Sequence, residues 1–145
     1  MARILILTPK QPSSNPRMRK SADALANAGH DVHVLYAYGT PWADNADKSI
    51  LTSVKWSYSR IGGHPQSERL HYLHSRIMRK LNEVLENTEQ ATCRSMSQFI
   101  QKGIQWHPDL VIGHNPGALG PSTRIAQRLG IPVAFDAEDF HRGES

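Results

Sequence analysis

The chain has 145 residues, of which 39% are hydrophobic, so it is long enough for one domain with a buried core. Its single cysteine, Cys93, excludes an intramolecular disulfide, and no basic and apolar leader precedes the first strand-like run. We therefore expect a reducing, cytoplasmic location. No window is apolar enough to span a membrane. The net charge of +4 favours anionic partners, meaning phosphate esters, nucleic acid or an acidic membrane surface.

The first forty residues predict a strand, a helix and a second strand. The run RILILT (Arg3 to Thr8) is almost entirely apolar, which is typical of a parallel strand buried on both faces. A helix follows, because Asn15 can cap it, Pro16 suits its first position and Gly29 suits its end. DVHVLYAY (Asp31 to Tyr38) is the second strand, so the segment predicts a right-handed crossover onto a parallel sheet.

The middle of the chain is less regular. The segment GTPWADNADKS (39–49) predicts a polar loop, and the alternation of apolar and polar residues in SVKWSYSR (53–60) predicts a third strand near a sheet edge. Apolar residues then recur at helical spacing from about Glu68 to Ile104. This spacing predicts one long helix, or two helices with a break near Asn87.

The last third of the chain predicts two more strands around a helix. LVIGH (110–114) is the fourth strand, PSTRIAQRLG (121–130) is a helix with an early proline and a terminal glycine, and IPVAFD (131–136) is another buried strand. The whole pattern predicts an α/β fold with a Rossmann-like, doubly wound and mainly parallel sheet of about five strands. We expect the strand order 3-2-1-4-5, with helices on both faces.

Ligands of such sheets bind outside the carboxyl ends of the strands, where the winding reverses. The predicted site therefore lies between the loops that follow the first and fourth strands. The first of these loops, TPKQPSSNPRMRK, contains no glycine, so a pyrophosphate cannot approach its backbone closely and NAD or FAD is disfavoured. Its helix start still offers N–H groups to an anion, and Ser13, Ser14, Asn15 and Arg17 add donors. The plain alternative is that Asn15 only caps the helix and that the arginine is solvated.

The loop after the fourth strand begins with His114 and Asn115, and Gly117 permits a ligand to approach closely. We expect these residues to contact substrate, although a purely structural histidine is the alternative. The chain after the fifth strand is rich in titratable residues: Asp136, Glu138, Asp139, His141 and Glu144. Their spacing matches no recognised metal motif, so we expect helix capping or contacts to a neighbouring domain and no bound metal.

Four segments in this order resemble the N-terminal domain of a GT-B glycosyltransferase of family 4: RILILTP with SSNPR, LANAGHDVHVL, PDLVIGHNPGAL and GIPVAFDAEDFH. The resemblance covers essentially all of residues 1–145. It implies a retaining transferase of hexosyl type with a nucleotide-sugar donor and no cofactor, in which this domain mainly holds the acceptor. It also implies that His114 faces the transferred sugar, so we take His114 as the catalytic candidate, with Asn115, Gly117, Asp136 and Glu138 among the substrate-binding candidates.

The sequence departs from that family at two points. Many members have glycines in the first loop that contact the donor diphosphate, and relatives often have Asp-x-His where this chain has Asp136, Ala137 and Glu138. The resemblance further implies a C-terminal donor-binding domain with a paired-glutamate motif, which the 145 residues lack. We therefore expect residues 1–145 alone to fold without catalysing transfer. We also expect a wet cleft wall that includes Ser13, Asn15, Arg17, His114 and Asp136.

Functions of other classes stay open. A non-enzymatic phosphosugar-binding or nucleotide-binding module would use the same crevice. A membrane-surface domain that docks the acceptor is also open, because Arg69, Arg76 and Lys80 flank the apolar stripe of the long helix and would meet anionic headgroups at the inner membrane face. A solvated helix flank is the plain alternative. Nucleic acid is not expected, because the basic residues are scattered and no aromatic stacking platform is present.

Overall fold

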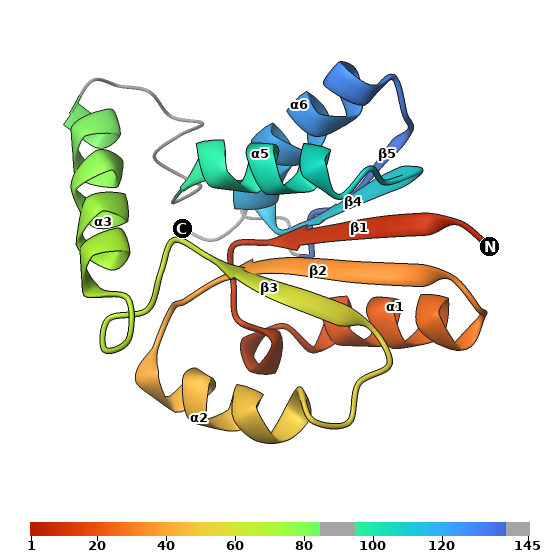
Figure 1. Cartoon of the computed structure of the whole chain (residues 1–145), viewed down its shortest axis with the longest axis horizontal. Helices are drawn as coiled ribbons and strands as arrows, with labels where there is room; N and C mark the ends of the chain where they lie inside the picture. The colour runs from red at the N-terminus through yellow and green to blue at the C-terminus, as the bar shows by residue number, and fades with distance from the viewer. Residues whose placement is uncertain (85–94, 139–145) are drawn as a thin grey trace.

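The computed structural model describes residues 1–84 and 95–138 and contains one parallel sheet (Figure 1). The strands are β1 (Arg3–Thr8), β2 (Asp31–Ala37), β3 (Ser57–Ile61), β4 (Leu110–His114) and β5 (Val133–Asp136). Their order is β3-β2-β1-β4-β5, and every neighbouring pair is parallel. The predicted α/β class and strand order are therefore confirmed.

Helices connect the strands in the manner of a doubly wound fold. They are α1 (Pro16–Asn27), α2 (Pro41–Ile50), α3 (Arg69–Val84), α5 (Met96–Gln105) and α6 (Leu119–Leu129), together with the 3-10 helices η1 (Pro12–Ser14) and η2 (Pro116–Ala118). The predicted start of α1 is confirmed, because the Asn15 side chain accepts a hydrogen bond from the N–H of Met18. The predicted break near Asn87 lies outside the described residues.

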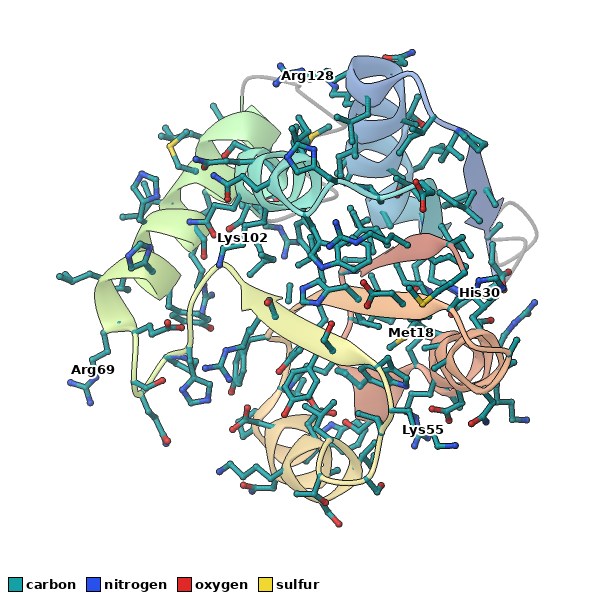
Figure 2. The ribbon with its side chains drawn as sticks, turned by 45° about the vertical axis from the view of Figure 1, so that its right-hand side comes forward. Met18, His30, Lys55, Arg69, Lys102 and Arg128 are labelled. Atoms are coloured by element: carbon teal, nitrogen blue, oxygen red, sulfur yellow. The ribbon has the colours of Figure 1, made fainter. Side chains whose placement is uncertain are left out.

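The core has two parts, one on each face of the sheet. Leu5 of β1 belongs to the part that includes Phe99 of α5, whereas its neighbour Ile6 belongs to the part that includes Met18 of α1. Figure 2 shows Met18 between α1 and the sheet. Because successive side chains of a strand point to opposite faces, the apolar run Ile4–Leu7 of β1 requires helices on both sides.

The prediction of a polar loop over 39–49 is wrong, because α2 lies there. Its charges suit a helix, with Asp44 in the first turn and Lys48 in the last. The buried residues of α2 are Ala43 and Asp47, so the segment has no apolar stripe that predicts a helix. The helix is instead fixed by tertiary hydrogen bonds, described below.

The prediction that the strand over 131–136 is buried is also wrong. β5 lies at the edge of the sheet, and Val133 and Phe135 are 42% and 38% exposed. An edge strand has a neighbour on one side, so an apolar sequence does not ensure that its side chains are covered. β3 lies at the opposite edge, as predicted, although it begins at Ser57 rather than near residue 53.

α3 and α5 occupy the predicted helical region but differ in their surroundings. α5 packs on the sheet with Phe99 and Ile100 in the core. α3 stands apart, beyond the carboxyl ends of the strands (Figure 1). None of the described helices combines the length and the apolar composition that crossing a bilayer requires.

Candidate functional site at the strand ends

The carboxyl ends of three adjacent strands bring the predicted site residues together. His114 ends β4 and lies in register with Asp136, which ends β5. β1 is the other neighbour of β4, and it ends at Thr8 beside the start of α1. We call the residues that meet there the strand-end cluster: Asn15, Arg17, His114, Asn115, Asp136 and Glu138.

Side-chain amides connect the three strand ends. Asn15 Nδ2 donates hydrogen bonds to Oδ1 of Asn115 at 2.9 Å and to the hydroxyl of Thr8 at 3.3 Å. Asn115 Nδ2 donates to Oε2 of Glu138 at 2.7 Å. Asn15 also caps α1 through its Oδ1. One buried network therefore links the start of α1, the end of β4 and the chain after β5.

Asn115 holds an unusual backbone conformation. Its φ of 68° and ψ of 152° fall in a region that is essentially reserved for glycine. Its N–H donates to the carbonyl of Asp136 at 3.0 Å, and its side chain is bonded on both sides. Such strain persists where the surrounding contacts fix the residue, and it clusters at functional sites.

Arg17 closes the cluster from the surface. Its guanidinium donates to the carbonyl of Glu138 at 2.8 Å and to the carboxylate of Asp136 at 3.2 Å, and its side chain is 59% exposed. The N–H of Glu138 donates to the same Asp136 oxygen at 2.9 Å. The guanidinium that we expected to face a ligand is therefore paired in this structure, and it fastens the chain after β5 to the first turn of α1.

His114 is buried beside two carboxylates. Its Nδ1 lies 3.5 Å from Oε1 of Glu138 and 3.7 Å from Oδ2 of Asp136, and the side chain is 1% exposed. Among the residues that the structure describes, neither ring nitrogen has a hydrogen-bond partner. Burial lowers the pKa of His114 below its ordinary value of 6.5, although both carboxylates oppose the shift. Burial therefore favours the neutral imidazole, in which one ring nitrogen is a donor and the other an acceptor.

The expectation of a wet cleft wall is wrong for two of its residues. His114 and Asn15 are both buried. Glu138, which is hydrogen-bonded to Asn115, lies against His114 and covers its ring. Asn15 is buried because its side chain caps α1 and is hydrogen-bonded to Asn115. These contacts depend on partners distant in sequence, which no local pattern reveals.

Ser13 and Ser14 belong to a different set of contacts. The N–H of Ser13 donates to the Asp47 carboxylate at 2.7 Å and its hydroxyl donates to the Ala43 carbonyl at 3.0 Å. The Ser14 hydroxyl donates to the Gln11 carbonyl at 2.8 Å. Both serines, placed in the predicted site, therefore hold η1 and α2 rather than contact the strand-end cluster.

Two buried polar residues were not predicted from the sequence: Thr8, which ends β1 beside the strand-end cluster, and Gln11, which belongs to the contacts of η1 and α2. Gln11 Oε1 accepts the N–H groups of Gly39 and Thr40, each at 2.7 Å, and Gln11 Nε2 donates to Asp47 at 3.3 Å. Thr8 supplies the hydroxyl of the amide network. A threonine that ends an apolar strand is a usable signal, whereas a glutamine in a polar loop gives none.

Gly117 is buried in η2, the 3-10 helix that begins at the residue after Asn115. Asp139, His141 and Glu144, which we expected to cap a helix or contact a neighbouring domain rather than bind a metal, lie outside the described residues. Within residues 1–84 and 95–138, no group of three or more His, Cys, Asp or Glu side chains is arranged to hold a metal ion.

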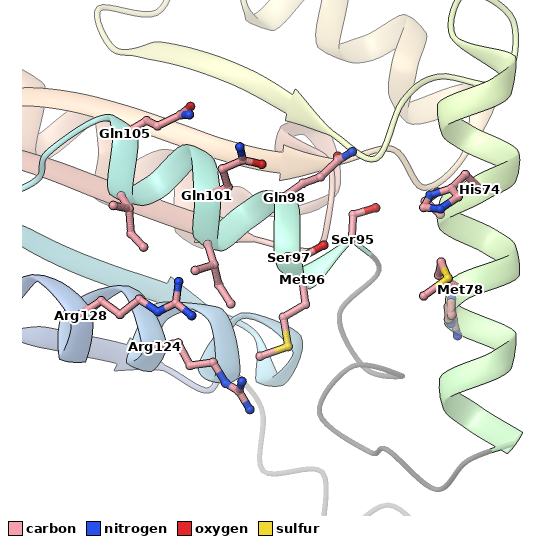
Figure 3. Close-up of a pocket in the computed structure, with 14 residues that line it drawn as sticks. His74, Met78, Ser95, Met96, Ser97, Gln98, Gln101, Gln105, Arg124 and Arg128 are labelled. Carbon is pink, nitrogen blue, oxygen red and sulfur yellow. The ribbon is translucent and has the colours of Figure 1, made fainter.

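Two cavities lie near α3. One of about 480 Å³ opens between α3 and the loops after β1 and β2, lined by Pro9, Gly39 and Arg76 among others, at the same edge of the sheet as the cluster. Another of about 560 Å³ lies between α3, α5 and α6, and Figure 3 shows His74 and Arg124 at its sides. No predicted site residue lines the second cavity.

A known protein family and several solved structures are similar to this chain. A family model described as a glycosyl transferase 4-like domain matches residues 14–145. The structure of the glycosyltransferase VinC with dTDP is similar at a TM-score of 0.56 and 18% identity, over 90% of this chain and 33% of that one. The Streptomyces glycosyltransferase SsfS6 is similar at a TM-score of 0.57 and 19% identity, over 93% of this chain and 39% of that one.

Other matches limit what the likeness shows. The C-terminal domain of a Pyrococcus furiosus hydrogenase has a TM-score of 0.55 at 15% identity, over 93% of this chain and 90% of that domain. At such identities the structural likeness shows the fold alone. A search of curated proteins finds no match. The chain spans about a third of the length of the two glycosyltransferases.

Proposed function

Because the chain belongs to the glycosyl transferase 4-like domain family, we propose that it is the N-terminal, acceptor-side domain of a retaining glycosyltransferase. The complete protein would move a hexosyl group from a nucleotide sugar to an acceptor. The two-domain organisation is supported by the longer glycosyltransferases, of which this chain spans about a third. We propose a cytoplasmic location, because a lone cysteine suits a reducing compartment.

The observation that carries the proposal is the state of His114. Two buried ring nitrogens without a hydrogen-bond partner among the described residues are an unusual cost for a folded domain, and such groups call for a functional explanation. The carboxylates of Asp136 and Glu138 lie on the Nδ1 side, which favours a proton there. Nε2 is then an acceptor for a hydroxyl of the transferred sugar.

We propose that Arg17 binds an anionic group of the substrate and that Asn15 holds Asn115, the neighbour of His114, in place. The Arg17 guanidinium lies at the first turn of α1, where the helix dipole favours an anion, and in this structure the Asp136 carboxylate fills that role. A phosphate or an acidic acceptor would compete for the same guanidinium. Because His114 is buried, substrate must displace neighbouring groups, and the exposed Arg17 contacts are the first that we expect to open.

The acceptor is proposed to enter the cavity of about 480 Å³ between α3 and the loops after β1 and β2. It lies at the same edge of the sheet as the strand-end cluster, which is where ligands of doubly wound sheets bind. We expect no cofactor or metal. We expect positively charged groups of the proposed donor-binding domain to stabilise the leaving diphosphate.

The test uses the protein translated from the complete reading frame. Purified protein is incubated with single nucleotide sugars, release of nucleoside diphosphate is followed, and the anomeric configuration of the product is determined by NMR. We expect release that depends on an acceptor, with retention of configuration. His114→Ala should lower kcat by about 10²-fold while the thermal midpoint changes little.

His107→Ala is the matched control, because His107 is an exposed histidine just before the opposite end of β4. It should retain normal turnover. Normal turnover of folded His114→Ala would make His114 structural. Binding of a nucleotide sugar without any transfer would replace the enzyme with a phosphosugar-binding or nucleotide-binding module.

A further inference from the structure

The apolar stripe of α3 faces solvent. Its members are between 49% and 83% exposed: Leu70, Leu73, Ile77, Leu81 and Val84. Successive helix residues are about 100° apart, so these five side chains lie within about a quarter of the helix circumference. A stripe of this kind normally packs on a core. Here it forms a continuous apolar surface on a helix at the end of the molecule (Figure 1).

The opposite side of α3 is the one that is attached. Ser75 is buried, and its hydroxyl donates to the Gly62 carbonyl at 3.1 Å. By helical spacing Ser75 lies roughly opposite Ile77 and Leu70. Gly63 brings the chain so close that an added Cβ would lie 2.8 Å from His71 Cβ. The attachment therefore fixes α3 with its apolar stripe pointing away from the sheet.

Basic residues border the stripe. Four residues of α3 are Arg or Lys and one is Glu, and the Glu is paired with Arg79 at 3.0 Å. By helical spacing Arg69, Arg76 and Lys80 lie along one border of the stripe. Figure 2 shows Arg69 pointing outward at the start of the helix. An exposed apolar stripe bordered by cations is the pattern of a helix that lies in a membrane interface.

We propose that α3 is a docking surface for an anionic phospholipid bilayer. The apolar stripe would enter the boundary between headgroups and acyl chains, while Arg69, Arg76 and Lys80 extend to the anionic headgroups. The charge of the border selects this occupant over a neutral bilayer. Docking would hold the carboxyl-end edge of the sheet, with its cavity of about 480 Å³, close to the lipid surface. The proposal concerns binding alone and stands whether or not the protein transfers sugars.

Flotation with vesicles tests this surface. The protein is mixed with vesicles of phosphatidylcholine alone, or of phosphatidylcholine with phosphatidylglycerol. We expect it to float with the anionic vesicles only, and less so at high salt because the charges are screened. The double variant Leu73→Glu/Ile77→Glu should lose at least about 100-fold in partitioning, because two inserting side chains become anionic. Leu119→Glu is the control, since Leu119 is exposed but lies on α6, and it should bind normally.

The basic border has its own variants. Arg76→Gln/Lys80→Gln should weaken partitioning about thirtyfold, since each basic residue near an anionic surface contributes about a factor of five. Lys20→Gln/Lys102→Gln removes the same charge from exposed positions elsewhere and should have a much smaller effect. Far-ultraviolet circular dichroism checks that each variant keeps its helix content.

Any of the following outcomes would overturn the proposal. The first is absence of binding to both kinds of vesicle. The second is equal binding to both, or binding that the Glu substitutions on α3 do not change. The third is a dimeric mass in light scattering that Leu73→Glu/Ile77→Glu converts to a monomer, which would assign the stripe to a second copy of the chain.

Discussion

The side-chain amides of Asn15 and Asn115, which are 100 positions apart in the sequence, meet at 2.9 Å. This hydrogen bond joins the start of α1 to the end of β4, and Asn115 passes the connection to Glu138 at 2.7 Å. The contact fixes the relative position of the two loops that flank the point where the winding of the sheet reverses. The surroundings of His114 therefore depend on an asparagine pair rather than on glycines.

The first prediction concerns Asn115. Asn115→Ala removes the partners of Asn15 and Glu138 and keeps a side chain at a φ of 68°. We expect the free energy of unfolding to fall by about 2–4 kcal/mol, measured by urea denaturation. Asn115→Gly loses the same hydrogen bonds but relieves the backbone, so it should cost about 1–2 kcal/mol less. Equal stability of the two variants would show that the backbone at this position is not strained.

The second prediction concerns Gly103 of α5. An added Cβ there would meet Ile125 and lie 3.0 Å from Leu5, so the helix can approach the sheet only because the side chain is absent. Gly103→Ala gains about 1 kcal/mol in helix propensity but overpacks the core, and we expect a net loss of about 1–2 kcal/mol. Lys102→Ala, at the exposed neighbouring position, is the control and should change stability by less than about 0.5 kcal/mol. A stabilised Gly103→Ala would mean that the core accommodates the methyl group.

The elements predicted best from the sequence are those whose local signal coincides with burial. β1 and β4 are apolar because helices cover both faces, and α1 carries its own cap at Asn15. α2 was missed because its inward face consists of Ala43 and Asp47, so hydrophobic spacing could not reveal it. The strand β5 was found, but its exposure was not, since coverage of an edge depends on what lies beside the strand.

The site was predictable where it depends on topology. The strand order places the ends of β1, β4 and β5 together. The convergence of Arg17, His114 and Asp136 therefore follows from the predicted strand order. The strand order does not predict that His114 is buried or that Ser13 is hydrogen-bonded to Asp47 instead of facing the site. Both arise from side chains that meet across long sequence separations, and in the second case from a helix that the sequence did not predict.

The third prediction separates stability from function at Arg17. Its ion pair with Asp136 is largely exposed, so Arg17→Ala should change the free energy of unfolding by less than about 1 kcal/mol. In the complete protein the same change should raise the KM for the acceptor about tenfold, because a charge-assisted donor is lost. Lys20→Ala, an exposed change on the same helix, should leave KM unaltered. An unaltered KM and kcat in Arg17→Ala would remove this residue from the site.

The fourth prediction is a pH dependence of stability. Burial lowers the pKa of His114 below 6.5, so below that pH the unfolded state binds a proton that the folded state does not. Stability should therefore be fully present above about pH 6.5 and fall as the pH decreases, with a slope of at most about 1.4 kcal/mol per pH unit from one proton. The pKa of His33 is also lowered by burial, so part of the slope remains in any single variant.

Urea denaturation at several pH values between about 7.5 and 5.5 measures this slope. His114→Gln should flatten this slope, because it removes the group whose pKa is lowered by burial. An identical slope in wild type and His114→Gln would show that His114 titrates alike in the folded and unfolded states.

The most direct measurement compares nucleotide-sugar turnover by residues 1–145 alone with turnover by the protein translated from the complete reading frame. The reactive cleft of a two-domain transferase forms between its halves, where closure excludes water and aligns donor with acceptor. We predict that residues 1–145 unfold cooperatively in calorimetry yet release no nucleoside diphosphate, while the complete protein does so with an acceptor present. Steady turnover by residues 1–145 alone would contradict the account and indicate a small single-domain enzyme.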